Sequence, residues 1–275
     1  MSGSGEALVV AMVNSDGKSA PVLPDPVGLT TQLHDLRLRA FARTPYDRLF
    51  TELGTLDAAE RALAAGCDAV YVDSFADYGV DSLRCVTSTP VVGAGEASIG
   101  EASADGRRFS IVTVWPRSMK YLYDERLARS AGGRCCAAVH FVSDEGELDR
   151  VGTSAGVQAR MRRREGKVLE RLLAACDDAV QRDAPDVLLL GCTCMSPVSG
   201  YLAERISVPV VDASAAGLRA AHAAALASPP AAAPPRSRRA GWSVRLAEAW
   251  LAVGEDVPAS TDECQVCAVL PTSVS

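Results

Sequence analysis

The chain has 275 residues, of which 48% are hydrophobic, and it carries a formal net charge of -6. That length and hydrophobic content are enough for one large domain or two modest ones. The acidic balance argues against a general nucleic-acid-binding protein, and the longest apolar runs are too short to cross a bilayer. The first residues, MSGSGEALVVAMVN, lack a basic segment ahead of a long apolar core, so we expect a cytoplasmic protein with no nucleic-acid or membrane role.

Apolar runs and helix-like segments alternate along the chain. Helical spacing of apolar residues predicts helices over residues 55–66 and 166–183. Runs that are apolar without alternation are typical of parallel strands buried on both faces. They predict strands over residues 7–13, 68–72, 90–94, 109–115, 136–142, 186–191 and 208–213. The pattern as a whole predicts an α/β fold.

Two segments share one plan, which indicates an internal duplication. Residues 68–95, DAVYVDSFADYGVDSLRCVTSTPVVGAG, pair with residues 186–214, DVLLLGCTCMSPVSGYLAERISVPVVDAS. Each has a buried strand, a small polar turn, a helix and a Pro-Val-Val strand, and Cys192 stands where the first copy has Ser74. In open α/β sheets ligands bind beyond the carboxyl ends of the strands. We therefore expect Ser74 and Cys192 on opposite walls of one cleft.

The duplication predicts two α/β halves and a separate C-terminal region. We assign residues 1–105 with 212–226 to the first half and residues 106–211 to the second. Residues 227–240 are rich in Pro and Ala and read as a linker. Residues 241–275 are expected to form a helix and a tail, with Trp242, Leu246, Trp250 and Leu251 on one helical stripe that docks on the body or on a partner subunit.

The cysteines and histidines suggest neither a disulfide framework nor a metal site. Nine cysteines is an odd number, and the expected compartment is reducing. Five of them lie among small apolar residues and are expected to be buried, inert thiols: Cys67, Cys85, Cys135, Cys136 and Cys176. The terminal pair Cys264 and Cys267 has redox spacing but no second pair, and the three histidines stand far apart. We predict no metal, and the lack of a Gly-rich dinucleotide loop or P-loop predicts no organic cofactor.

Several motifs together resemble the Asp/Glu/hydantoin racemase superfamily, most closely its hydantoin racemase branch. They are DAVYVDSFADYGVD (68–81), PVVGAGEAS (90–98), GRRFSIVTVWPRS (106–118), DVLLLGCTCM (186–195) and VPVVDASAAGLRAA (208–221). The resemblance covers residues 7–226. It implies two pseudo-symmetric α/β halves with the active site between them, and cofactor-independent proton transfer at a carbon next to a carboxylate or carbonyl. In most members each turn supplies a cysteine, one removing the proton and the other returning it.

Cys192 fits the role of principal acid/base. A cysteine thiol has a reference pKa of about 8.5, so a modest shift makes both of its forms available near neutral pH. Cys192 also ends a strand at a turn that is expected to open a helix, where free backbone N–H groups favour an anion. Cys194, two residues later, either substitutes for Cys192 or packs beneath it, and we favour packing.

Ser74 is the main departure from the family. A serine hydroxyl does not ionise usefully near neutral pH, so Ser74 is a poor base unless a neighbour such as Asp73 or Asp77 activates it. The alternatives are a hydrogen-bonding role, a proton relay, or a structural role in closing the turn.

Five further residues are candidates for substrate binding. The family pattern after the first strand is Asn-Pro-Asn-Thr, of which MVNS (12–15) retains Asn14 and Ser15 as donors. Phe75 and Thr193 adjoin the two catalytic positions. Thr113 ends a strand that should face the same cleft and is expected to meet a carboxylate or ureido group.

Three functions follow from these residues. We favour a racemase or epimerase acting beside a carboxylate, imide or ureido carbonyl of an amino acid or hydantoin-like substrate. The first alternative is a lyase similar to arylmalonate decarboxylase, in which Cys192 protonates an enolate on one face. The second is a non-catalytic binding protein that lost one base. In each case the partner is a small molecule with a carboxylate or carbonyl, and a homo-oligomer is left open.

Overall fold

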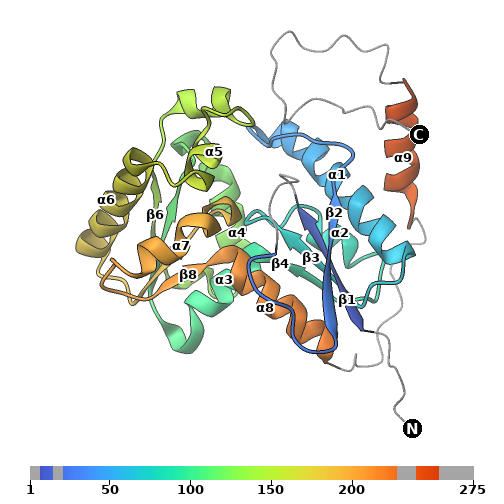
Figure 1. Ribbon diagram of the computed structural model, residues 1–275, viewed down its shortest axis with the longest axis horizontal. Helices are drawn as coiled ribbons and strands as arrows, with labels where there is room; N and C mark the ends of the chain where they lie inside the picture. The colour runs from blue at the N-terminus through green and yellow to red at the C-terminus, as the bar shows by residue number, and fades with distance from the viewer. Residues whose placement is uncertain (1–6, 15–20, 228–239, 254–275) are drawn as a thin grey trace.

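In a computed structural model, residues 7–14, 21–227 and 240–253 are described. These ranges contain two four-stranded parallel sheets with helices around them (Figure 1). The first sheet has the order β2-β1-β3-β4 and the second β6-β5-β7-β8. The fold is therefore the predicted α/β architecture with two parallel sheets.

All of the strands in the described ranges except β2 coincide with short apolar runs of the sequence. The first sheet contains β1 (Leu8–Asn14), β2 (Leu29–Asp35), β3 (Ala69–Asp73) and β4 (Val91–Gly93). The second sheet contains β5 (Phe109–Thr113), β6 (Cys136–Phe141), β7 (Val187–Leu190) and β8 (Val210–Asp212). Every residue of β3, β5 and β7 is buried. In the parallel register Asn14 aligns with Asp73 and Leu190 with Asp212, so the carboxyl ends of neighbouring strands lie at one edge of each sheet.

Helices connect and cover the strands. The longer ones are α1 (Pro45–Ala64), α3 (Ala94–Ala102), α4 (Lys120–Arg129), α6 (Gly166–Asp183), α7 (Ser196–Ala203), α8 (Ala213–Leu226) and α9 (Trp242–Val253). Shorter helical segments are α2 (Val80–Leu83), α5 (Val157–Arg162), η1 (Ala104–Gly106), η2 (Arg117–Met119), η3 (Gly133–Cys135), η4 (Glu145–Arg150) and η5 (Thr193–Met195). Although α8 follows the last strand of the second sheet, it packs against β3 and α3 of the first, and so it joins the two halves (Figure 1).

The sequence pattern missed one strand and shortened one helix. The strand β2 has the sequence LTTQLHD, and most of its residues are at least partly exposed at one edge of the first sheet. Because this composition is polar, a search for apolar runs does not find β2. Helix α1 begins ten residues before the predicted start at residue 55, at Pro45, where Thr44 and Asp47 form a capping box.

The C-terminal helix docks on the body, with only part of the predicted stripe in the contact. In Figure 1, α9 lies beside α1 at the right-hand side of the molecule. Ala247 is fully buried, and the Ser243 hydroxyl donates to Glu60 of α1. Of the predicted stripe, Trp242, Leu246 and Trp250 are about half exposed, although the centroid of the Trp250 ring lies 6.2 Å from that of Phe50 in α1. Small residues and Trp250 therefore share the contact with α1.

None of the helices in the described ranges has the length and apolar character that a membrane crossing requires. The predicted linker, Cys264 and Cys267 lie outside the described residues.

Candidate active site

The two duplicated turns meet at one place. The Ser74 turn (residues 74–79) follows β3, and the Cys192 turn (residues 191–195) follows β7. The Thr193 hydroxyl donates a hydrogen bond of 3.2 Å to the backbone carbonyl of Asp73, so the two turns are in direct contact. The duplication in the sequence thus corresponds to two turns that face each other across the junction of the halves.

A cavity of about 100 Å³ lies between these turns. Its polar lining residues are Thr51, Ser74, Gln158, Cys192 and Thr193. Its aromatic lining residues are Phe41, Phe75, Tyr78, Trp115 and Tyr123. The remaining described residues of its wall are Ala, Met, Leu, Val and Cys194, so none of the described lining residues is charged.

Ser74 is half-buried at the cavity, and its hydroxyl has no hydrogen-bond partner among the described residues. The carboxylate of Asp73 accepts hydrogen bonds of 2.7 Å from Tyr71 and from Ser214 of α8. The carboxylate of Asp77 accepts from α3 and from Arg126. Both predicted activators therefore have buried partners of their own, and within the described ranges neither carboxylate is hydrogen-bonded to the Ser74 hydroxyl.

Burial sets the ionisation of Asp77. Desolvation raises the pKa of its carboxyl to about 7, although Arg126 and the amides of Gly95 and Glu96 act in the opposite direction. The group therefore titrates near neutral pH rather than in the usual range for an aspartate.

Cys192 forms a disulfide with Cys194, with Cα atoms 5.1 Å apart. This corrects the prediction that Cys194 packs beneath Cys192 as a separate thiol. The backbone N–H of Cys194 also lies 3.2 Å from the sulfur of Cys192 and donates to it. The geometry follows from the local backbone, because Cys192 is the extended N-cap residue of η5 and its side chain turns back over the first amides of that segment.

Tyr123 of α4 supports the Cys192 turn. Its hydroxyl donates to the backbone carbonyl of Gly191 over 2.8 Å and lies 2.5 Å from the hydroxyl of Thr113. A Cβ atom at Gly191 would lie 2.5 Å from the Ile111 side chain and 3.0 Å from the Tyr123 ring, so glycine suits this close approach. Burial raises the pKa of Tyr123 above its ordinary value, which keeps the phenol neutral.

The structure brings four of the predicted site residues together and places one elsewhere. Ser74, Phe75, Cys192 and Thr193 all line the cavity. Thr113 does not, because its side chain is fully buried against Tyr123. Asn14 ends β1, at the same sheet edge as Asp73, while Ser15 lies outside the described residues.

The remaining cysteines are set apart from this site. Cys176 is buried as predicted, but Cys67, Cys85, Cys135 and Cys136 are only half-buried. Burial raises the pKa of Cys67 to about 11 and of Cys136 and Cys176 to about 12, which suits unreactive thiols. Within the described part of the chain, no group of three or more His, Cys, Asp or Glu residues could hold a metal ion.

Comparison with known proteins identifies the family of this chain. The model of the family described as Asp/Glu/Hydantoin racemase matches residues 23–221, which include both turns and the cavity between them. The chain belongs to the Asp/Glu/hydantoin racemase family.

Curated relatives in this family are hydantoin racemases. The chain is 34% identical to one from Paenarthrobacter aurescens over 56% of its own length, and 33% identical to one from a Pseudomonas strain over 64%. These alignments span 60% and 66% of the two relatives, just under two thirds.

Solved structures share the fold of this family member. An allantoin racemase from Klebsiella pneumoniae superposes with a TM-score of 0.64 at 21% identity, covering 90% of this chain and 89% of that one. An arylmalonate decarboxylase variant superposes with a TM-score of 0.57 at 20% identity, covering 84% and 98%.

Most lining residues of this racemase-family site were not predicted from the sequence, among them Phe41, Tyr123 and Gln158. Phe41 lies in the segment before α1, Tyr123 in α4 and Gln158 in α5, all far in sequence from the two turns. Neither a motif nor a period singles them out. Only the tertiary fold carries them to the cavity.

Proposed function

We propose that this protein is a cofactor-independent racemase that moves a proton at a carbon next to the carbonyl of a neutral, hydantoin-like ring. The observation that carries the proposal is the cavity between the two turns, with a cysteine on one wall and a hydroxyl on the other. Proton exchange on both faces of one carbon needs groups on two opposing walls. The family and its hydantoin racemase relatives give the same reaction class.

The lining favours a neutral substrate over a free amino acid. A zwitterionic amino acid brings two charges, and burying a charge without a partner is costly. The described lining residues include no charged side chain, whereas Thr51, Gln158 and Thr193 offer neutral hydrogen-bonding groups and five aromatic rings offer apolar surface. An imide or ureido ring with an apolar substituent suits such a wall.

Cys192 acts in its reduced form. A thiol reductant opens the Cys192–Cys194 bond by exchange, giving two protein thiols and an oxidised reductant. The Cys192 thiolate then takes the proton from its face of the carbon, and the enolate receives a proton on the opposite face from the Ser74 wall. In the reverse direction the Cys192 thiol gives its proton to the enolate. The N–H of Cys194, which points at this sulfur, favours the thiolate because a hydrogen bond to the charged form stabilises it.

Ser74 completes the opposite wall as a hydrogen-bond donor or proton relay. Since no described group activates it, we expect the Ser74 face to be the slower one. The same asymmetry motivates the second candidate, a lyase in which loss of carbon dioxide generates the enolate and Cys192 protonates it. The absence of a cationic side chain from the described lining makes a dicarboxylate substrate the less suited of the two.

The test is exchange of the α-hydrogen in deuterated water, followed by proton NMR on each enantiomer of a 5-substituted hydantoin with dithiothreitol present. We expect exchange and loss of optical activity without added metal or cofactor, and loss of both in Cys192→Ala. Cys85→Ala, which removes a half-buried thiol outside the cavity, is the control and should keep full activity. Full activity in Cys192→Ala, or dependence on zinc, pyridoxal phosphate or nicotinamide, would overturn the proposal. Decarboxylation of an arylmalonate without any racemisation would favour the lyase.

A further inference from the structure

The Ser74 turn is fixed from behind by a single buried carboxylate. Asp77 adopts a left-handed backbone conformation, with φ of 51°, and its side chain is fully buried. Its carboxylate accepts hydrogen bonds from the backbone amides of Gly95, at 2.7 Å, and Glu96, at 2.8 Å. These amides are among the first of α3, whose free N–H groups need acceptors. Asp77 therefore caps α3 while belonging to the turn that carries Ser74.

Two glycines allow the turn to lie flat against α3. A side chain at Gly93 would meet the Asp77 carboxylate at 2.2 Å, and one at Gly95 would meet the Phe75 carbonyl at 2.0 Å. Such distances leave no room for a methyl group. The turn is thus seated on α3 through close backbone contact as well as through Asp77.

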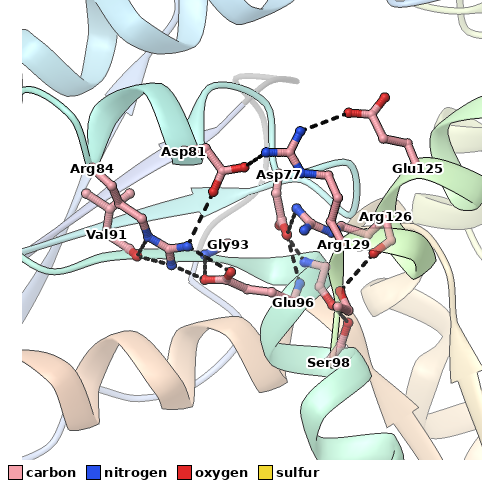
Figure 2. A network of polar contacts seen from close by, with 12 residues as sticks. Asp77, Asp81, Arg84, Val91, Gly93, Glu96, Ser98, Glu125, Arg126 and Arg129 are labelled. Atoms are coloured by element: carbon pink, nitrogen blue, oxygen red, sulfur yellow. Dashed lines mark hydrogen bonds and ion pairs between the residues drawn. The ribbon is translucent and has the colours of Figure 1, made fainter. Parts of the chain in front are cut away.

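The same carboxylate also reaches the other half of the molecule. Arg126 of α4 donates to Asp77 over 2.8 Å, and its side chain is only 8% exposed (Figure 2). Figure 2 shows Asp77 between the start of α3 and Arg126, with the pairs Arg84–Glu96 and Arg129–Asp81 around it. Those outer pairs are more exposed, so solvent weakens them. The buried Asp77–Arg126 pair therefore fixes the position of the Ser74 turn relative to α4.

Helix α4 contacts both turns at once. Arg126 holds the Ser74 turn through Asp77, and Tyr123, three residues earlier, holds the Cys192 turn through the Gly191 carbonyl. Residues three apart lie on one face of a helix. The Tyr123 ring also stacks on Phe75, with centroids 5.3 Å apart. Because Tyr123 and Arg126 lie one helical turn apart on α4, this helix fixes the distance between the two turns.

We infer that Asp77 and Arg126 are positioning residues that hold the Ser74 face of the cavity at its distance from Cys192. The inference rests on the proposed function for its catalytic meaning. Neither Asp77 nor Arg126 lines the cavity between the turns. They act through the Ser74 turn, and a misplacement of about 1 Å can cost roughly 10²-fold in rate.

The first measurement is backbone hydrogen–deuterium exchange of the full chain by mass spectrometry. We compare the natural protein with Asp77→Asn, Arg126→Gln and the double variant. Asp77→Asn replaces the charged acceptor of the Gly95 and Glu96 amides, so it should speed their exchange by roughly ten-fold. Both single variants break the Asp77–Arg126 pair, so both should lose protection over residues 74–79, and the double variant should add little to that loss. Asp124→Asn, which breaks the exposed Lys120–Asp124 pair on the same helix, is the control and should change nothing there.

The second measurement is the ratio of α-hydrogen exchange rates for the two enantiomers of a 5-substituted hydantoin. A variant that merely unfolds in part loses active molecules, which scales both rates equally and leaves their ratio unchanged. Displacement of the Ser74 face alone should change the ratio by about ten-fold or more.

The outcomes separate this inference from the proposed function. No α-hydrogen exchange in the natural protein would reject the racemase, and the protection of residues 74–79 would still decide whether Asp77 and Arg126 hold the turn. Unchanged protection in both single variants would overturn the inference. So would altered protection with an unchanged enantiomer ratio, because the residues would then be structural only.

Discussion

A thiol introduced at Ser74 should provide an acid/base group on both walls of the cavity instead of one. The change is Ser74→Cys, which restores sulfur to the wall opposite Cys192. In the natural protein the Ser74 hydroxyl has no activating partner among the described residues. We therefore expect one enantiomer of a 5-substituted hydantoin to exchange its α-hydrogen much faster than the other, and the substitution to raise the slow direction.

The size of the effect follows from the cavity wall. A thiol with the reference pKa of about 8.5 is roughly one-tenth thiolate at about pH 7.5. The described lining offers no cation to lower that pKa, and its aromatic rings oppose ionisation. Positioned acid–base groups contribute about 10²–10⁴-fold, so the smaller thiolate fraction places the expected gain near 10²-fold.

The assay follows deuterium entry from each enantiomer by proton NMR, with dithiothreitol present so that the new thiol cannot pair with Cys192. Ala76→Cys is the matched control, since it places a thiol on the same turn and cavity wall, two residues away. Only Ser74→Cys should raise the slow direction and bring the two exchange rates together. Similar rates for both enantiomers in the natural protein, with no change in Ser74→Cys, would refute the reasoning and show that Ser74 is already an effective base.

Three further predictions concern redox state, the C-terminal helix and pH. Cys194→Ala removes the disulfide partner of Cys192, so its exchange activity should no longer depend on dithiothreitol, and an unchanged dependence would contradict this. Ala247→Glu puts a charge into the fully buried contact of α9 and should lower the free energy of unfolding by about 1–3 kcal/mol in thermal or urea unfolding, whereas Leu246→Glu, at an exposed position, should change it little. Because burial raises the pKa of Asp77 from 3.8 to about 7, the folded protein holds a proton in that interval which the unfolded chain releases. The contribution of Asp77 to the free energy of unfolding should thus fall as pH rises from about 4 to 7, and Asp77→Asn, compared with the natural protein across that range, should lack this contribution.

The strands that could be predicted are those whose residues are mostly apolar. The runs in β3 and β7 are apolar throughout because both faces of these strands are covered. Strand β2 lies at an edge and carries Thr, Gln and His, so the same criterion passes over it. A hydrophobic pattern finds an edge strand where its residues are apolar, as in β6, and misses one whose residues are polar, as in β2.

The two turns could be predicted because the duplication repeats a local sequence pattern. The other residues of the cavity wall come from segments that are distant in sequence. Ser74 and Cys192 occupy equivalent places after equivalent strands, which one sequence is enough to reveal. Phe41, Tyr123 and Gln158 reach the cavity from three other segments, and each position depends on how whole helices pack.

Thr113 shows why the end of a buried strand is hard to assign. All five residues of β5 are buried, so no alternation tells which side chains face the cavity and which face α4. The structure turns Thr113 toward Tyr123, whose hydroxyl in turn holds the Gly191 carbonyl beside Cys192. Its hydroxyl is thereby joined to the Cys192 turn through two hydrogen bonds, even though it does not line the cavity. A residue expected to meet the substrate thus supports the turn of Cys192, for which we propose the acid/base role. The helix α4 that Thr113 contacts also carries Arg126 toward the opposite turn.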